Sequence, residues 1–497
     1  MNHMDEMGMD MGMPRRMTMA LCDRTVSVEV SGDYTLPDYQ MPIRRVLTVR
    51  PTVLPPAKYV SGTGVEFNGT VDYQVLYVGT DGGLYTVPLS SEYSFNVPLE
   101  QVGEVDLNEG VTALASTVCE SLSTRVSAPR RMSIRGRLRS HVRAYGRVLM
   151  EESVSGAADP ATIRRLCEET ENMQISGGVS DVISLGVEIP GVGEDARVIT
   201  AEAVTLMDDV RPGDGLLRAA GNVWLDLLIG RESGAVERMT RKLPLEGEIE
   251  LEGLTPDSLC RATGTVSDVT VNVEDGRILC DVGVLLEGRG MQNLPLRYTA
   301  DLYSTETESV CEYEDYAVPV VLRCENRNLS QSERIAPESV NLPEGAELIH
   351  VWGEARMDAC EQAGDKYVLT GQSRYTLLLR KDGDYSTAEV TLPLRYETDG
   401  AGSAPSCFDA TAEVISCRAQ WSGETLSLDA ELSIVADFVG ENSIRALEEA
   451  RFGEKLDCRG NRMVVYYPVP GDTPWTVAKK YHISPERLTE GAAYYLL

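Results

Sequence analysis

The chain has 497 residues, 42% of them hydrophobic and 25% charged, and this ordinary globular composition excludes a wholly disordered protein. Its formal net charge of −31 argues against general nucleic-acid binding and against docking on anionic lipid, because both need basic surface. At about 150 residues per domain, the length predicts several domains. The sequence has no run of about 18 apolar residues, so we expect no membrane-spanning helix.

The cysteines and histidines indicate a reducing compartment and no metal site. Eleven cysteines lie at irregular spacing without a C-x-x-C pair, and the chain has only four histidines. This usage is typical of reduced thiols in a cytosol and lacks zinc-ligand spacing. No apolar run follows Arg15 and Arg16, so no Sec signal peptide is expected. We expect no cofactor.

The beginning of the chain and two later stretches differ from the rest. Residues 1–20 hold eight methionines among Asp and Gly, which predicts a disordered leader. Asp159–Pro160 is a good helix start, so the spacing predicts a helical linker over 151–170. Ser443 as a cap and Gly453 as a stop predict a second helical linker over 441–462.

One pattern comes three times in the middle of the chain. Each copy has an alternating strand that opens with Gly, a Gly-containing turn, and a strand that ends at Pro, which is typical of a β-hairpin. The strands open at Gly69 (G-T-V-D-Y-Q-V-L-Y), Gly221 (G-N-V-W-L-D-L-L-I) and Gly371 (G-Q-S-R-Y-T-L-L-L). The turns lie at Asp81–Gly83, near Ser233–Gly234 and at Asp382–Gly383, and the prolines are Pro88, Pro244 and Pro393.

The match continues downstream of the hairpins. The second and third copies share A-T-x-x-V at Ala262 and Ala410, and nineteen residues later each has an Asp in an apolar strand, Asp281 and Asp429. The first copy has a looser equivalent that ends at Ile134. A repeat that matches at several offsets predicts three β-domains.

The fold class that follows is mainly β, with three tandem antiparallel β-domains and a small βαα tail. The expected segments are the leader 1–20, domains 21–150, 171–305 and 306–440, linkers 151–170 and 441–462, and the tail 463–497.

The first repeat resembles a known family. Its segments V-E-V-S-G-D-Y-T-L-P-D-Y (28–39), V-D-Y-Q-V-L-Y (71–77) and S-A-P-R-R-M-S-I-R-G-R-L (127–138) are similar to the SPOCS domain. That domain is found in proteins of endospore-forming bacteria. The second and third copies look like diverged members.

The last 35 residues resemble a LysM module through Y-P-V-P-G-D-T-P-W-T-V-A-K-K-Y-H-I-S-P-E-R-L (467–488). The pattern predicts a short strand, a turn, a helix capped by Thr473 with Pro474 at its first position, and a second helix that starts at Ser484–Pro485. The resemblance implies a partner-binding site at Gly471, Asp472, Thr473, Trp475 and Tyr481.

The tail also departs from the family. The usual Asn-containing turn reads Gly491–Ala492–Ala493, and the closing β-strand of the family is missing. We therefore expect the tail to dock on another domain or on a partner, or to borrow Tyr494–Leu497 as a makeshift strand. LysM modules bind sugar with the loops before the first helix and after the second, so peptidoglycan is a less favoured ligand than protein.

SPOCS repeats followed by one LysM module are typical of SipL-type spore coat morphogenetic proteins. The resemblance implies a place in the mother-cell cytoplasm, at the forespore surface and spore coat. It implies that the protein docks the assembling coat through the coat basement-layer ATPase or other coat proteins, with the LysM module as a protein-binding surface.

A basic stripe stands out in this acidic chain. Between residues 122 and 150 there are eight Arg and no Asp or Glu. Alternation places Arg135, Arg137, Arg139 and Arg143 on one face of a strand. A solvated sheet face balanced by neighbouring carboxylates and an interface to an acidic partner or to a second copy are both compatible with this pattern.

Neither a phosphate-binding loop nor a nucleophile with a base and a carboxylate is evident, so we expect no enzyme. The leading hypothesis is a scaffold for spore coat assembly that acts through protein–protein contacts. Two alternatives stay open. One is a peptidoglycan-binding spore-surface protein, and the other is a self-assembling fibre or shell subunit.

Overall fold

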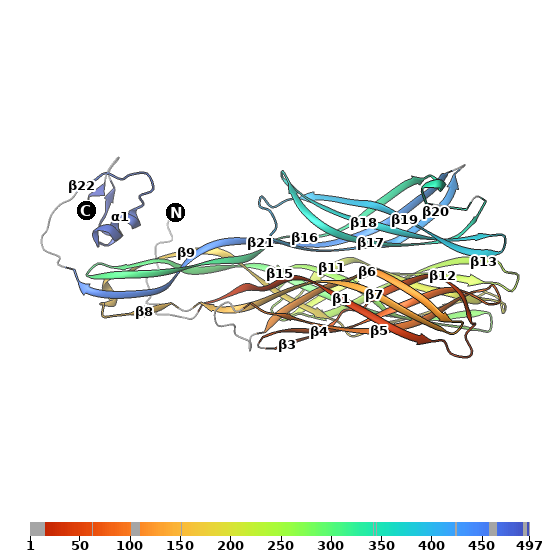
Figure 1. Cartoon of the computed structure of the whole chain (residues 1–497). Coiled ribbons are helices and arrows are strands. Elements are labelled where there is room, and N and C mark those ends of the chain that lie inside the picture. The colour runs from red at the N-terminus through yellow and green to blue at the C-terminus, as the bar shows by residue number, and fades with distance from the viewer. Residues whose placement is uncertain are drawn as a thin grey trace.

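The computed structural model describes residues 15–61, 63–100, 110–150, 152–340, 342–343, 345–422, 425–456, 465–490 and 495–496. Strands dominate this part of the chain, where they form seven sheets, and α1 (Pro474–Tyr481) is its one α-helix. All sheet pairings are antiparallel except that of β8 (Ser153–Ser155) with β21 (Thr425–Lys455). The molecule is elongated, with a broad body at one end and a narrow arm at the other (Figure 1). The predicted mainly β, antiparallel fold is therefore confirmed.

Six of the sheets face one another in three pairs. In pair 1, one sheet has the order β1-β7-β6, and in the other β4 pairs with β2, β3 and β5. Its strands are β1 (Arg15–Thr35), β2 (Ile43–Val53), β3 (Ala57–Ser61), β4 (Gly64–Gly79), β5 (Leu84–Pro98), β6 (Val111–Ala128) and β7 (Arg131–Met150).

Pairs 2 and 3 repeat this arrangement. Pair 2 joins the sheet β10-β15-β14, which β9 extends, to the sheet β11-β12-β13, and pair 3 joins β16-β21-β20 to β17-β18-β19. The strands of pair 2 are β9 (Ile163–Val179), β10 (Ile183–Ile189), β11 (Arg197–Pro212), β12 (Leu216–Gly230), β13 (Val236–Glu250), β14 (Leu259–Glu274) and β15 (Arg277–Ser304). Those of pair 3, besides β21, are β16 (Thr307–Ile335), β17 (Glu347–Ala363), β18 (Lys366–Lys381), β19 (Asp384–Asp399) and β20 (Cys407–Ser422).

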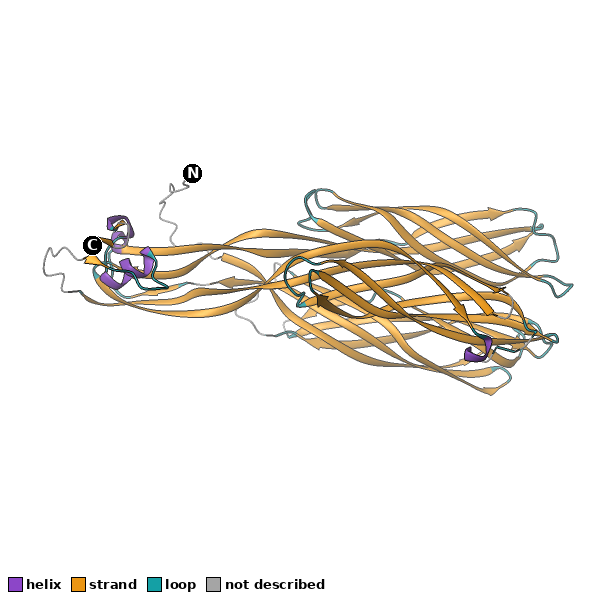
Figure 2. Ribbon diagram, turned by 90° about the horizontal axis from the view of Figure 1, so that it is seen from above, coloured by secondary structure: helices purple, strands orange, loops and turns teal. Residues whose placement is uncertain are grey.

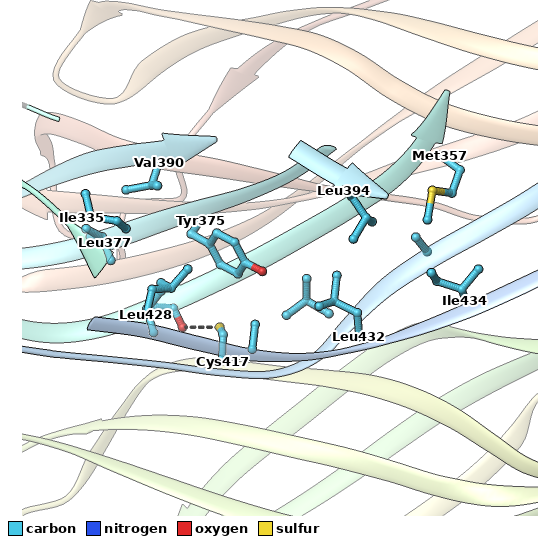
Figure 3. Close-up of a cluster of buried hydrophobic side chains, with 14 of the residues drawn as sticks. Ile335, Met357, Tyr375, Leu377, Val390, Leu394, Cys417, Leu428, Leu432 and Ile434 are labelled. Atoms are coloured by element: carbon cyan, nitrogen blue, oxygen red, sulfur yellow. Dashed lines mark hydrogen bonds between the residues drawn. The ribbon is translucent and has the colours of Figure 1, made fainter. Parts of the chain in front are cut away.

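Each pair encloses its own hydrophobic core. In pair 3 the inward side chains of β17–β19 meet those of β20 and β21, and Figure 3 shows Tyr375 and Leu377 facing Leu428 and Leu432. Pairs 1 and 2 have equivalent cores. The alternation of apolar and polar residues in these strands produces this layering, because successive side chains point to opposite faces.

The three hairpin prolines lie inside strands, where we expected them to end strands. Pro88 stands opposite Gln74, Pro244 opposite Asn222, and Pro393 opposite Gln372. Among the strands that the structure describes, β5, β13 and β19 pair with a neighbour on one side only. Proline lacks an N–H, and an edge strand tolerates this because one of its sides makes no ladder hydrogen bonds.

A further core lies where the three pairs meet. β2, β11 and β17 each carry a β-bulge at the same repeat position, at Leu47, Ile199 and Ile349. The residues that follow these bulges face Leu76, Leu228 and Leu378. A bulge changes the direction of its side chain. Here the three bulge residues and the three leucines belong to one apolar cluster, which also contains Val78, Leu84, Trp352 and Tyr385.

The arm is built from strands that continue out of the body. β9 pairs with residues 287–304 of β15, and the first half of β16 pairs with the second half of β21. β15 ends at Ser304 and β16 begins at Thr307, so the chain reverses at the far end of the arm, which we name the tip. Figures 1 and 2 show these long strands and the C-terminal segment beside the tip.

The predicted helical linkers are wrong over the residues that the structure describes, 152–170 and 441–456. Asp159 does cap a turn, because its carboxylate accepts a hydrogen bond from the Ala161 N–H (3.0 Å), but this turn, η2 (Pro160–Thr162), is a single 3₁₀ turn. β9 begins directly after it, and β21 runs through residues 441–455. Pairing with distant strands outweighs the local helix signals in both stretches.

The predicted leader is also corrected in part. Residues 15–20 belong to β1, where Met17 and Met19 are buried against the base of the arm. Residues 1–14 and 457–464 lie outside the described residues, so the rest of the leader and the end of the second linker stay predictions. The ten cysteines in the described part of the chain are free thiols, and their reduced state in a cytosol stays a prediction.

Candidate functional site

The C-terminal segment, residues 465–490 and 495–496, has a small fold of its own. β24 (Tyr495–Leu496) pairs with β22 (Val465–Tyr466) and β23 (Thr489–Glu490), so residues 495–496 supply the makeshift strand that we expected as one way to complete the tail. Thr473 caps α1 in a capping box with Thr476, with Pro474 at the first helical position. The predicted second helix is reduced to one 3₁₀ turn, η4 (Pro485–Arg487). The turn 491–493 lies outside the described residues.

Two of the five predicted site residues form the turn before α1. Gly471 has φ +100°, a conformation that a side chain would strain. The Asp472 carboxylate accepts hydrogen bonds from the Val469 N–H (2.8 Å) and the Tyr466 hydroxyl (2.7 Å). These two bonds lower the pKa of Asp472. The turn is therefore held in one conformation by its own side chain.

Trp475 joins this segment to the tip. Its indole Nε1 donates to Asp301 Oδ2 (2.8 Å), and its ring stands edge-on to Tyr303 with centroids 4.9 Å apart. Lys479, one turn further along α1, donates to Asp301 Oδ1 (2.5 Å). The Tyr313 hydroxyl of β16 donates to the same carboxylate (2.6 Å). One carboxylate of the arm thus binds two side chains of α1.

Further contacts come from the loop after α1. The Tyr303 hydroxyl donates to the Ile483 carbonyl (2.6 Å), His482 Nδ1 donates to the Ser304 carbonyl (3.1 Å), and Arg164 Nε donates to Ser484 Oγ (3.1 Å). Tyr481 instead packs inside the segment, edge-on to Tyr466. Among the five predicted residues, Trp475 contacts the tip, and Gly471, Asp472, Thr473 and Tyr481 shape the segment.

Asp301 is ionised under ordinary conditions. Burial alone would raise the pKa of its carboxyl, but the hydrogen bonds from Lys479, Trp475 and Tyr313 outweigh burial and lower it. Burial raises the pKa of Tyr303 to about 12, so this phenol stays protonated and can donate. Sequence reasoning missed Asp301, Tyr303 and Tyr313, since nothing in their local pattern distinguishes them from other strand residues.

The C-terminal segment also exposes two large apolar side chains to solvent. Tyr467 is 68% exposed and Val469 60%, both in the stretch between β22 and α1. Large exposed apolar side chains close together in sequence mark a candidate contact surface. They precede the helix that docks on the tip, so the segment can contact the arm and a partner with different residues.

The arginine stripe changes character along β7. Arg135 and Arg137 are exposed on the sheet β1-β7-β6. Arg139 is half-buried and forms ion pairs with Glu120 (Nε–Oε1, 3.2 Å) and with Asp358 of pair 3 (Nη2–Oδ1, 3.0 Å). Arg143, 2% exposed, is fully covered. The inner half of the stripe therefore contacts another part of the same chain. For the exposed Arg135 and Arg137 both predictions, a solvated sheet face and an interface, stay open.

Arg143 belongs to a buried cluster of five charges between the sheet pairs. Its Nη2 lies 3.1 Å from Asp409 Oδ2 and 3.2 Å from Asp437 Oδ1. Arg289 contacts both carboxylates, and Arg261 lies 3.6 Å from each. No side chain of this charge cluster is more than 5% exposed. Although burial opposes ionisation, the three guanidinium groups lower the pKa of both Asp409 and Asp437.

The residues of the charge cluster come from equivalent positions in the three sheet pairs. The last two long strands of each pair share a bulge, at Glu120, Ser267 and Ile415. Six residues before each bulge, the facing residues are Leu114 and Arg143 in pair 1, Arg261 and Arg289 in pair 2, and Asp409 and Asp437 in pair 3. Divergence at this position therefore gives the three pairs complementary charges. Two members of the cluster could have been seen in the sequence, because Arg261 and Asp409 stand directly before the two A-T-x-x-V segments.

The register also corrects one repeat equivalence. Asp281 and Asp429 are exposed on the outer faces of their strands, whereas Ile134 is fully buried. β6 carries an additional bulge at Ser127, which inserts one residue before this position. Arg135, opposite Ser123, is therefore the structural equivalent of Asp281 and Asp429. Pair 1 presents a cation where the other two present an anion.

The three pairs also border a partly open pocket of about 580 Å³, lined by equivalent strands of each pair. Glu413 of β20 borders it. Burial raises the pKa of Glu413 to about 7. The pocket walls carry charges of both signs, among them Arg139, Glu287 and Glu354, and this mixture selects no single ligand class.

Comparison with known proteins gives no relative from which to transfer a function. No family model, no curated protein and no solved structure matches this chain. Among the described residues no helix has the length and apolar character that crossing a membrane requires. The residues and their geometry therefore carry the functional argument.

Proposed function

We propose that this chain is a non-enzymatic scaffold of the bacterial endospore coat. In this proposal the three sheet pairs are tandem SPOCS-like domains and the C-terminal segment is a LysM-like module that binds protein. The chain would act in the mother-cell cytoplasm, at the forespore surface, where it connects the coat basement-layer ATPase or other coat proteins. The motifs of the first repeat and of the tail support the family, and the geometry supports the mode of action.

The observation that carries the proposal is the docking of α1 on the tip. Asp301 binds Trp475 and Lys479 at the far end of strands that run continuously into the body. Figure 2 shows this segment at one end of the molecule and the loops of the sheet pairs at the other. An elongated body with a contact module docked at one end suits an adaptor that holds two partners apart.

The surfaces available for such contacts differ in chemistry. Tyr467 and Val469 offer apolar area on the C-terminal segment, and aromatic side chains supply much of the energy of protein interfaces. Arg135 and Arg137 offer exposed cations on an otherwise acidic chain, which suits an acidic coat partner or the acidic surface of a second copy.

Affinity purification from sporulating cells tests the proposal. The tagged full-length chain should co-purify coat proteins, and Trp475→Ala should lose them because the segment is released from the tip. Trp421→Ala, which truncates a partly exposed Trp on β20, is the matched control and should retain them. Circular dichroism should show unchanged strand content in both variants. Capture of the same coat proteins by Trp475→Ala would contradict a role for the docked segment.

Two alternative functions rest on the same surfaces. A peptidoglycan-binding protein would sediment with purified cell wall and lose this on removal of the tail. A fibre or shell subunit would form regular assemblies of the purified chain in electron micrographs. Sedimentation or assembly without any coat partner would favour the corresponding alternative.

A further inference from the structure

Three different metal-binding side chains meet at the junction of pairs 1 and 3. Asp23 of β1, His141 of β7 and Cys407 of β20 place a carboxylate oxygen, a ring nitrogen and a thiol sulfur all within 4.8 Å of one another. His141 Nε2 lies 2.7 Å from Asp23 Oδ1. The three residues are separated by more than one hundred positions in sequence, which explains why ligand spacing gave no signal.

The set matches the preferences of one class of ion. Zinc in proteins is bound by thiolate sulfur, imidazole nitrogen and carboxylate oxygen, with four ligands in tetrahedral arrangement. Harder cations such as Mg²⁺ and Ca²⁺ select oxygen ligands and would not use Cys407. Three protein ligands leave a fourth position for water, and Asp23, with 44% of its side chain exposed, leaves the site open to solvent.

Burial raises the pKa of the Cys407 thiol, and the neighbouring Arg143 cation opposes this effect. Arg143 Nη1 lies 3.7 Å from Cys407 Sγ and can donate to it, and hydrogen bonds of this kind from outside the ligand set tune the metal site. The guanidinium is itself balanced by Asp409 and Asp437. A divalent ion bound by one thiolate, one carboxylate and one neutral imidazole would add no net charge.

We propose that Asp23, His141 and Cys407 bind one Zn²⁺ ion that connects β1 and β7 of pair 1 to β20 of pair 3. The ion would sit beside the buried charge cluster and link two sheet pairs that are far apart in sequence. This inference concerns the assembly of the chain and does not depend on the proposed function.

Metal content tests the site directly. The full-length chain, stripped with a chelator and then incubated with zinc chloride, should retain one Zn²⁺ per chain after gel filtration. Cys407→Ser and His141→Gln should each weaken binding at least tenfold. With cobalt chloride, the wild-type chain should show thiolate-to-cobalt charge-transfer absorption, and Cys407→Ser should abolish it. Added Zn²⁺ should raise the thermal midpoint of the wild-type chain and not that of the variants.

Cys119→Ser serves as the matched control, because Cys119 is a partly buried thiol of pair 1 that lies outside this set. It should bind Zn²⁺ and Co²⁺ like the wild type. No retained metal in the wild type would overturn the proposal and leave the Asp23–His141 contact as a plain hydrogen bond. Full binding in both Cys407→Ser and His141→Gln would overturn it as well, since other donors would then hold the ion.

Discussion

At the scale of single residues, the junction of the sheet pairs holds ionisable groups that the solvent scarcely reaches. His350 of β17 has 1% of its side chain exposed and packs edge-on against Trp352. Burial, together with the charges of Arg238 and Arg50, lowers its pKa to about 3. Asp226 lies 3.5 Å from His350 Nε2 but is already paired with Arg238, so it does little to favour the imidazolium.

We predict that His350 makes the protein sensitive to mild acid. The unfolded state binds the proton at a pKa of 6.5 and the folded state only at about 3, so the free energy of unfolding falls as pH decreases between these values. His350→Gln should flatten this dependence, by roughly a few kcal/mol over the window. Urea unfolding at pH 7 and pH 5 measures it, and an equal loss of stability in both proteins would contradict the prediction.

Glu413 should act with the opposite sign. Its folded pKa of about 7 lies above the ordinary glutamate value of 4.5, so its contribution to stability is full below 4.5 and is lost as pH rises toward 7. Glu413→Gln should therefore increase the free energy of unfolding at pH 7.5 and leave it nearly unchanged at pH 4. Thermal unfolding at both values checks this, and the exposed Glu431→Gln on β21 should show no such gain.

At the scale of elements, the docked helix depends on one carboxylate. Asp301→Asn removes the charge that Lys479 pairs with, so amide hydrogen exchange in α1 should become faster at neutral pH. Because the pKa of Asp301 is lowered, the wild-type contact is intact above the ordinary carboxyl pKa near 3.9 and weakens below it.

The control for this prediction is Asp315→Asn, which changes an exposed carboxyl on the neighbouring strand β16. It should leave exchange in α1 unchanged. If Asp301→Asn also left exchange unchanged, the remaining contacts, such as Tyr303 to Ile483, would hold the segment by themselves.

Element prediction succeeded where local signals and the fold agree. The three hairpins follow from alternating strands and Gly turns, and positive φ at Gly82, Gly234 and Gly383 explains why glycine stands there. It failed in β9 and in the second half of β21, because their partners lie far away in the sequence. Ile134 was wrongly matched to Asp281 and Asp429, because the bulge at Ser127 cannot be seen without the strand register.

At the scale of the whole molecule, the buried charge cluster fixes which sheet pair meets which. Pairs 1 and 2 supply guanidinium groups and pair 3 supplies both carboxylates. A buried ion pair adds little net stability over apolar packing, but loss of one partner is costly. The cluster therefore favours one arrangement of three similar units over the alternatives.

We predict that Asp437→Asn destabilises the chain by about 3–5 kcal/mol, because it leaves three buried cations against a single carboxylate. The thermal midpoint should fall clearly. Asp429→Asn, on the same strand but exposed, should change stability by less than about 0.5 kcal/mol. Equal effects of the two substitutions would show that the cluster is not the contact that holds the pairs together.

The candidate sites were predictable to different degrees. The turn and helix of the C-terminal segment follow from its own residues, and Trp475 was named from its motif. Its partner Asp301 could not be identified from the sequence, because 174 residues separate the two. Arg143 was grouped with exposed arginines because alternation gives the face of a strand but not what covers that face.

For the proposed role as a spore coat scaffold, the sharpest test is the position of the chain in living cells during sporulation. A fluorescent fusion of the full-length chain should form a shell around the forespore from the mother-cell side, and the Trp475→Ala fusion should stay dispersed in the mother cell. A wild-type fusion that is dispersed throughout sporulation, or that locates to the wall of vegetative cells, would contradict the account.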